Sequence, residues 1–78
     1  MIAKNKGGEY MNNILEGVDT TGKVRALMIT RNIQQTEMAN LLDVTEETIR
    51  NRFKRGDWHL KELQVIAAKY NIEVSDLI

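Results

Sequence analysis

The chain has no cysteine and only one histidine among its 78 residues. Disulfide bonds and thiolate metal sites are therefore excluded, and we expect neither a metal site nor a bound cofactor. No apolar run approaches the roughly 18 residues that a membrane-spanning helix needs. No apolar segment follows the N-terminal lysines, as it would in a secretory signal. These absences predict a soluble, cytoplasmic protein with no membrane partner.

Side chains for catalysis are equally scarce. The single histidine, His59, has no cysteine or second histidine to act with, so little is present to build a nucleophile or general base. The pair Gly7-Gly8 lacks the strand-to-helix context in which glycine-rich loops bind phosphate. We therefore expect that this protein is not an enzyme.

Net charge is also absent, because 11 lysines and arginines balance 11 aspartates and glutamates. Proteins that bind nucleic acids are usually basic, so the total counts against such a partner. The distribution is uneven, however, since residues 50–55 contain Arg50, Arg52, Lys54 and Arg55 and no acid. The sequence thus predicts a local anion-binding face and weak nonspecific affinity for DNA.

Residues 1–19 show no clear periodicity and include glycine and asparagine pairs. This composition predicts a flexible N-terminal arm. The alternative is a basic arm that enters a DNA minor groove, but glycine and glutamate dilute its two lysines. Residues 20–78 are sufficient for one small domain with a modest core.

The first helix is predicted to run from Thr20 or Thr21, either of which offers a capping hydroxyl, to Arg31. Asn32 suits the left-handed backbone conformation that commonly ends a helix. Ile33 follows as an apolar plug. The domain is therefore expected to begin with a helix of about three turns.

The stretch from Gln34 to Gly56 contains two short helical patterns separated by a tight break. The first pattern, residues 34–42, has an inward face formed by Met38-Ala39 and Leu42. Asp43 lies in the break, where we expect a positive φ that aspartate tolerates better than most residues.

The second pattern begins at Thr45, a good N-cap, and extends to about Lys54. Ile49 and Phe53 are four residues apart and form its inward face. Cations gather toward its C-terminal end. Two short helices with a compact turn, the second of them cationic, favour insertion into a DNA groove.

The most regular helical pattern in the chain follows Trp58. One face carries an apolar stripe formed by Leu60, Leu63, Ile66, Ala67 and Tyr70. Asn71 is expected to end this helix, and Glu73 or Ser75 to cap a last short turn that ends in Leu77 and Ile78. The prediction is an all-α domain of four to five short helices.

Three types of side chain that might suggest a ligand site have simpler explanations. We expect Trp58 to be core or half-buried packing rather than a DNA or partner contact. Met28 and Met38, at helical spacings, are expected in the core. His59 is interpreted as a helix cap or a surface residue.

From Lys23 to Ile78 the residues resemble the helix-turn-helix domains of phage repressor and Cro proteins. The matching positions, in order, are Gln35, Met38-Ala39, Leu42, Val44, Thr45, Thr48-Ile49, Arg55-Gly56 and the ending from Asn71 to Leu77. The resemblance implies a compact lambda-repressor-like fold and a phage or prokaryotic transcription regulator, such as a repressor. It also implies a homodimer on a two-fold operator of double-stranded DNA.

The chain departs from the family pattern at three places. Asp43 replaces the usual glycine of the turn, and Arg52 stands where a hydrophobe is usual, with Phe53 taking the inward place one residue later. Glu46 and Glu47 put two acids at the start of the recognition helix, where polar or basic residues are more common.

These patterns define the candidate contacts with DNA. Base edges are expected to meet the N-terminal part of the third helix, and phosphates its basic end and the start of the second helix. The candidate base contacts are Thr45, Glu46, Glu47, Arg50 and Asn51, and the candidate phosphate contacts are Gln35, Arg52, Lys54 and Arg55. For the two glutamates, a favourable interaction with the helix dipole is an equal alternative.

The acids on this helix and the zero net charge also leave a second function open. The same fold could serve as a protein-binding antirepressor or adaptor that targets another regulator. For a dimer, we expect the interface on the fourth helix and the C-terminal turn with Leu77-Ile78.

Overall fold

The computed structural model describes residues 19–78, and every regular element within them is helical. In chain order the elements are α2 (Thr20–Arg31), α3 (Gln35–Leu42), α4 (Glu46–Arg55), α5 (Leu60–Tyr70) and the short 3₁₀ helix η1 (Val74–Asp76). The predicted all-α class, with four helices and a last short turn, is confirmed. Apart from Asp19, the predicted N-terminal arm lies outside the described residues.

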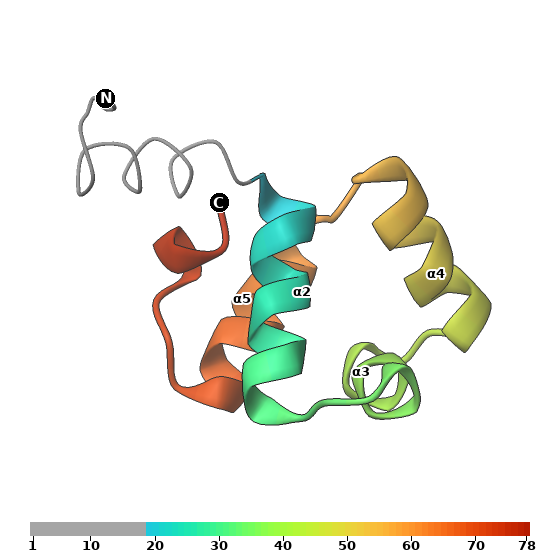
Figure 1. Cartoon of the computed structure of the whole chain (residues 1–78), viewed down its shortest axis with the longest axis horizontal. Helices are drawn as coiled ribbons and strands as arrows, with labels where there is room; N and C mark the ends of the chain where they lie inside the picture. The colour runs from blue at the N-terminus through green and yellow to red at the C-terminus, as the bar shows by residue number, and fades with distance from the viewer. Residues whose placement is uncertain (1–18) are drawn as a thin grey trace, which may run out of the picture.

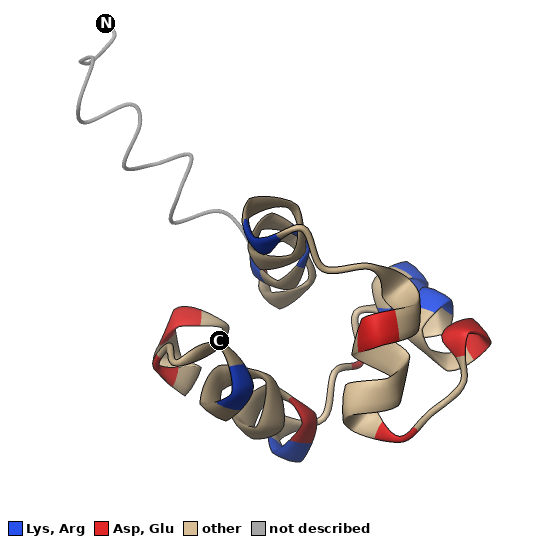
Figure 2. Ribbon diagram, turned by 90° about the horizontal axis from the view of Figure 1, so that it is seen from below, with Lys and Arg blue, Asp and Glu red and all other residues tan. Residues whose placement is uncertain are grey.

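The described helices are distributed from one end of the structure to the other (Figure 1). α3 and α4 lie together at one end of the described structure, and η1 lies at the other, with α2 and α5 between them (Figures 1 and 2). This arrangement leaves much of α4 at the edge of the molecule. A helix at an edge has one face for the core and another for solvent or a partner.

The start of α2 corrects one prediction. Neither Thr20 nor Thr21 caps this helix, because Asp19 is the N-cap and its carboxylate accepts a hydrogen bond of 2.9 Å from the Gly22 N–H. Aspartate is as good a cap as the hydroxyl residues, and its charge also favours the helix N-terminus. The Thr21 hydroxyl instead accepts a 3.2 Å hydrogen bond from the indole N–H of Trp58.

Three helices end at non-glycine residues with positive φ. Asn32, Asp43 and Asn71 have φ of 55°, 58° and 58°. This confirms the positive φ expected at Asn32 and Asp43, and Asn71 ends α5 as expected. Asparagine and aspartate accept this conformation more readily than other side chains. Gly56 ends α4 in the same way, at φ 71°.

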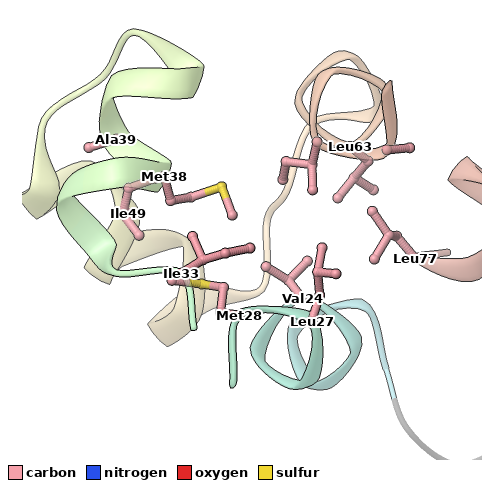
Figure 3. Close-up of a cluster of buried hydrophobic side chains, with 11 residues drawn as sticks. Val24, Leu27, Met28, Ile33, Met38, Ala39, Ile49, Leu63 and Leu77 are labelled. Atoms are coloured by element: carbon pink, nitrogen blue, oxygen red, sulfur yellow. The ribbon is translucent and has the colours of Figure 1, made fainter. Parts of the chain in front are cut away.

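The core forms where α2 meets the inward faces of α3, α4 and α5 (Figure 3). Its fully enclosed members include Val24, Met38, Ile49 and Ile66, each 0% exposed. Ile33 is buried as the predicted plug, and Met28 and Met38 are confirmed as core residues. Met38 and Ile49 therefore fix α3 and α4 to the rest of the domain.

Two residues near the end of α4 complete this packing. Phe53 and Trp58 are half-buried, and their rings meet edge to face with centroids 5.1 Å apart. The half-buried packing expected of Trp58 is confirmed. Leu60, expected on the inward face of α5, is instead 55% exposed. It is the first residue of α5, and the buried positions of that helix begin only at Leu63.

Candidate nucleic-acid interface

A three-residue turn joins α3 to α4 and sets the direction in which α4 leaves the core. Asp43 takes the left-handed conformation, and the Val44 N–H donates to the Ala39 carbonyl over 3.0 Å. The Thr45 hydroxyl then accepts a 3.1 Å hydrogen bond from the Thr48 N–H and so caps α4. Local hydrogen bonds thus determine both the end of α3 and the start of α4.

The outward face of α4 carries most of the predicted base contacts. Glu46, Glu47 and Arg50 are exposed, and Asn51 is half-exposed, whereas Ile49 between them is buried. The burial of Ile49 therefore presents these four polar side chains to solvent. Thr45 is also exposed, but its hydroxyl is used in the cap.

The two acids at the start of α4 differ in their surroundings. Glu46 accepts a 3.2 Å hydrogen bond from the Thr36 hydroxyl of α3, which links the first turns of the two helices. Both acids lie in the first turn of α4, where negative charge interacts favourably with the helix dipole. Glu46 thus has a structural role in addition to its exposed position.

The structure brings two candidates from different helices together. Gln35, the first residue of α3, and Arg50 of α4 line one open groove of about 520 Å³. The opposite wall belongs to α2, which contributes Arg25 and Ile29. The groove is therefore built from side chains of three helices.

Arg52 is the candidate that the structure corrects. Its side chain is only 15% exposed, and its guanidinium donates to both carboxylate oxygens of Glu62 at distances of 3.0, 3.3 and 3.0 Å. Asp57 lies 3.9 Å from the same group. The sequence suggested a phosphate contact, but this guanidinium is already paired with carboxylates and fastens α4 to the start of α5.

The same pairing shifts the pKa of both partners in the direction that favours their charged forms. The hydrogen bond from Arg52 to Glu62 raises the pKa of Arg52, although partial burial opposes this. For Glu62, burial acts to raise the pKa, but the hydrogen bonds from Arg52 and from the His59 N–H outweigh it and the pKa is lowered. Glu62 therefore stays ionised, and it also accepts the His59 N–H at the start of α5 over 3.0 Å.

Lys54 and Arg55, the other predicted phosphate contacts, are exposed in the last turn of α4. Figure 2 shows basic and acidic segments in the region of α3 and α4, so the surface is mixed in charge rather than uniformly basic. Three basic residues of α4, which are Arg52, Lys54 and Arg55, lie in its last turn, and its acids lie in the first turn. The positive charge of α4 is therefore concentrated in its C-terminal half.

Sequence reasoning missed Arg25 as part of this site. Its guanidinium carbon lies 5.1 Å from the centroid of the Phe53 ring, so the cation stacks on an aromatic side chain of α4. The helical spacing already placed Arg25 on the same face of α2 as Met28 and Ile29. Only the packing of α2 against α4 shows that this face adjoins Arg50.

Other kinds of site have little support in the part of the chain that the structure describes. Residues 19–78 contain no group of three or more side chains arranged to hold a metal ion. None of the helices formed by these residues has the length and apolar character required to cross a bilayer.

Comparison of the chain with family models, with curated proteins and with solved structures finds no match. The functional interpretation therefore depends on the residues and geometry of α2, α3 and α4.

Proposed function

We propose that this protein is a sequence-specific regulator of transcription that binds double-stranded DNA. In this proposal α3 and α4 act as a helix-turn-helix, and α4 enters the major groove. The observation that carries it is the outward face of α4, where Arg50, Asn51 and Lys54 follow one another along a helix anchored by the buried Ile49.

The roles of the side chains follow from their chemistry. Arg50 can donate two hydrogen bonds to guanine, and an exposed Glu47 can accept one from the amino group of cytosine. A good bidentate pair, such as that of Arg50 with guanine, contributes about 1–3 kcal/mol of discrimination. Lys54, Arg55 and Gln35 would bind phosphates and fix the register of the protein on the duplex.

A homodimer on a two-fold operator would supply the affinity that one small module lacks. A single copy offers few phosphate contacts, and two carboxylates near the DNA reduce nonspecific attraction. Two copies would place their α4 helices in successive major grooves about one helical turn apart. The exposed side chains of Val65 on α5 and Ile78 at the C-terminal end, 37% and 59% exposed, are available for the interface.

A second candidate, binding of another regulator protein, is favoured by the acids on α4. Glu46 and Glu47 lie on the very surface that would face DNA phosphates.

Selection of bound fragments from random duplex DNA tests the two functions. Recovery of a two-fold consensus supports DNA binding, whereas failure to enrich any sequence at low salt would contradict it. An Arg50→Ala variant that selects a different consensus would identify Arg50 as a base contact.

A further inference from the structure

The open groove between α2 and α4 has an apolar lining, which is not needed to bind the phosphates of a DNA backbone. Its volume is about 520 Å³, and its apolar lining comes from Met28, Ile29, Ile33 and Phe53. Ile29 is 74% exposed, the largest exposed fraction among the exposed large apolar side chains of the described residues. An isoleucine in this position gains nothing from phosphates, but it would be stabilised by an apolar side chain placed against it.

Both walls of the groove also carry a cation. Arg25 projects from α2 and stacks on Phe53, and Arg50 projects from α4. Within residues 19–78, the ion pairs of arginine involve only Arg52, so neither groove arginine has a carboxylate partner there. Stacking of Arg25 on the ring still leaves the edge of its guanidinium able to bind a carboxylate through two hydrogen bonds.

We propose that this groove binds an acidic, amphipathic segment of a partner protein. One apolar side chain of the segment would pack against Ile29 and Phe53, and flanking carboxylates would pair with Arg25 and Arg50. The occupant is identified by charge complementarity together with the exposed apolar wall, which a nucleic acid would leave uncovered. The volume lies within the range of sites that hold a few side chains.

The position of Arg50 makes this segment a competitor of DNA. Arg50 lies both in the groove and on the outward face of α4, so a carboxylate bound to it removes a proposed base contact. Gln35, a proposed phosphate contact, lines the same groove. This regulatory consequence rests on the proposed DNA-binding function, whereas binding of the segment itself does not.

A random-peptide phage library selected against the full chain, without DNA, tests the proposal. We expect enriched peptides to carry a large apolar residue flanked by aspartate or glutamate. One such peptide, labelled and measured by fluorescence anisotropy, should bind Arg25→Glu and Ile29→Gln about tenfold or more weakly than the wild type. The same peptide should displace any duplex selected by the protein.

Matched controls separate the groove from the general surface. Lys61→Glu reverses an exposed cation of α5, and Leu60→Gln removes an exposed leucine at the start of the same helix, so both should bind the peptide as the wild type does. Circular dichroism of every variant verifies that the helices are retained.

Four results would overturn the proposal. The first is that the library yields no enriched peptides, and the second is that the enriched peptides lack acidic residues. The third is that the wild type and the Ile29→Gln variant bind the peptide equally well. The fourth is that the wild type self-associates and Ile29→Gln abolishes this, which would place a second copy of the chain in the groove. If no peptide is selected and Ile29→Gln weakens DNA binding, the groove binds DNA and not a protein segment. If peptides bind through the groove but no duplex is ever selected, the groove proposal stands and the proposed DNA-binding function fails.

Discussion

Substitution of Glu62 by glutamine tests the linkage between α4 and α5. Glutamine keeps a carbonyl that can accept the His59 N–H, but it removes the charge that pairs with Arg52. The side chains of Arg52 and Glu62 are 15% and 13% exposed. A hydrogen bond to a charged group contributes about 1.5–3 kcal/mol, and a solvent-exposed ion pair at most about 1 kcal/mol. For this partly buried pair we expect a loss of about 1–2 kcal/mol at pH 7.

The dependence on pH distinguishes the ion pair from a simple loss of packing. Because the folded protein lowers the pKa of Glu62, its contribution is fully present above the unfolded value of about 4.3. It is lost as the pH falls through the lower folded value. The gap in unfolding free energy between wild type and Glu62→Gln should therefore shrink between pH 7 and pH 3.

Urea and thermal unfolding followed by circular dichroism measure this gap. At pH 7 the midpoint temperature of Glu62→Gln should fall by roughly 5–15 °C. Glu47→Gln, the same change at an exposed carboxylate, removes a favourable interaction with the helix dipole and should cost no more than about 1 kcal/mol. A Glu62→Gln loss that is independent of pH, or no larger than that of Glu47→Gln, would refute the assigned role of the pair.

Three further changes test the cap of α4, the core and a half-buried tyrosine. Thr45→Ala removes the cap of α4 and should lower the free energy of unfolding, measured with urea, by about 1 kcal/mol. Thr45→Asn keeps a capping side chain and should not lower it, so equal losses in the two variants would contradict the capping role. Ile66→Ala, at a fully buried position, should lower the free energy of unfolding by about 2–5 kcal/mol, far more than Val65→Ala at an exposed position. A loss no larger than that of Val65→Ala would place Ile66 outside the core. Partial burial, and then its hydrogen bond to Glu37, raise the pKa of Tyr70. The advantage of wild type over Tyr70→Phe should therefore be present at pH 7 and decline above pH 10, and a constant difference would count against this.

The helix ends were predictable from sequence because local chemistry determines them. Asn32, Asp43 and Asn71 are each favoured where φ must be positive, and a pattern of a few residues is sufficient to identify such sites. The burial of Ile49 follows equally from helical spacing. These positions also determine which side chains of α4 point outward, so most of the candidate surface could be predicted.

The remaining features depend on partners that are distant in sequence. The cationic neighbours of Arg52 predict a phosphate contact, but packing of α4 against α5 brings Glu62 within hydrogen-bonding distance of Arg52. Arg25 joins the site only because Phe53 of α4 lies against it. Leu60 fits the apolar face of α5 but precedes the part of that helix that reaches the core. Helical periodicity identifies the apolar face of a helix, but it does not predict over what length neighbouring elements bury that face.

The central claim is that the outward face of α4 binds DNA. The most direct measurement is the dependence of the binding constant on salt concentration, using duplexes selected by the wild-type protein. We predict a steep decrease in affinity with salt, with a slope that Lys54→Ala reduces by about one and that Arg52→Gln leaves unchanged. Salt-independent binding, or a slope reduced by Arg52→Gln rather than by Lys54→Ala, would contradict this claim.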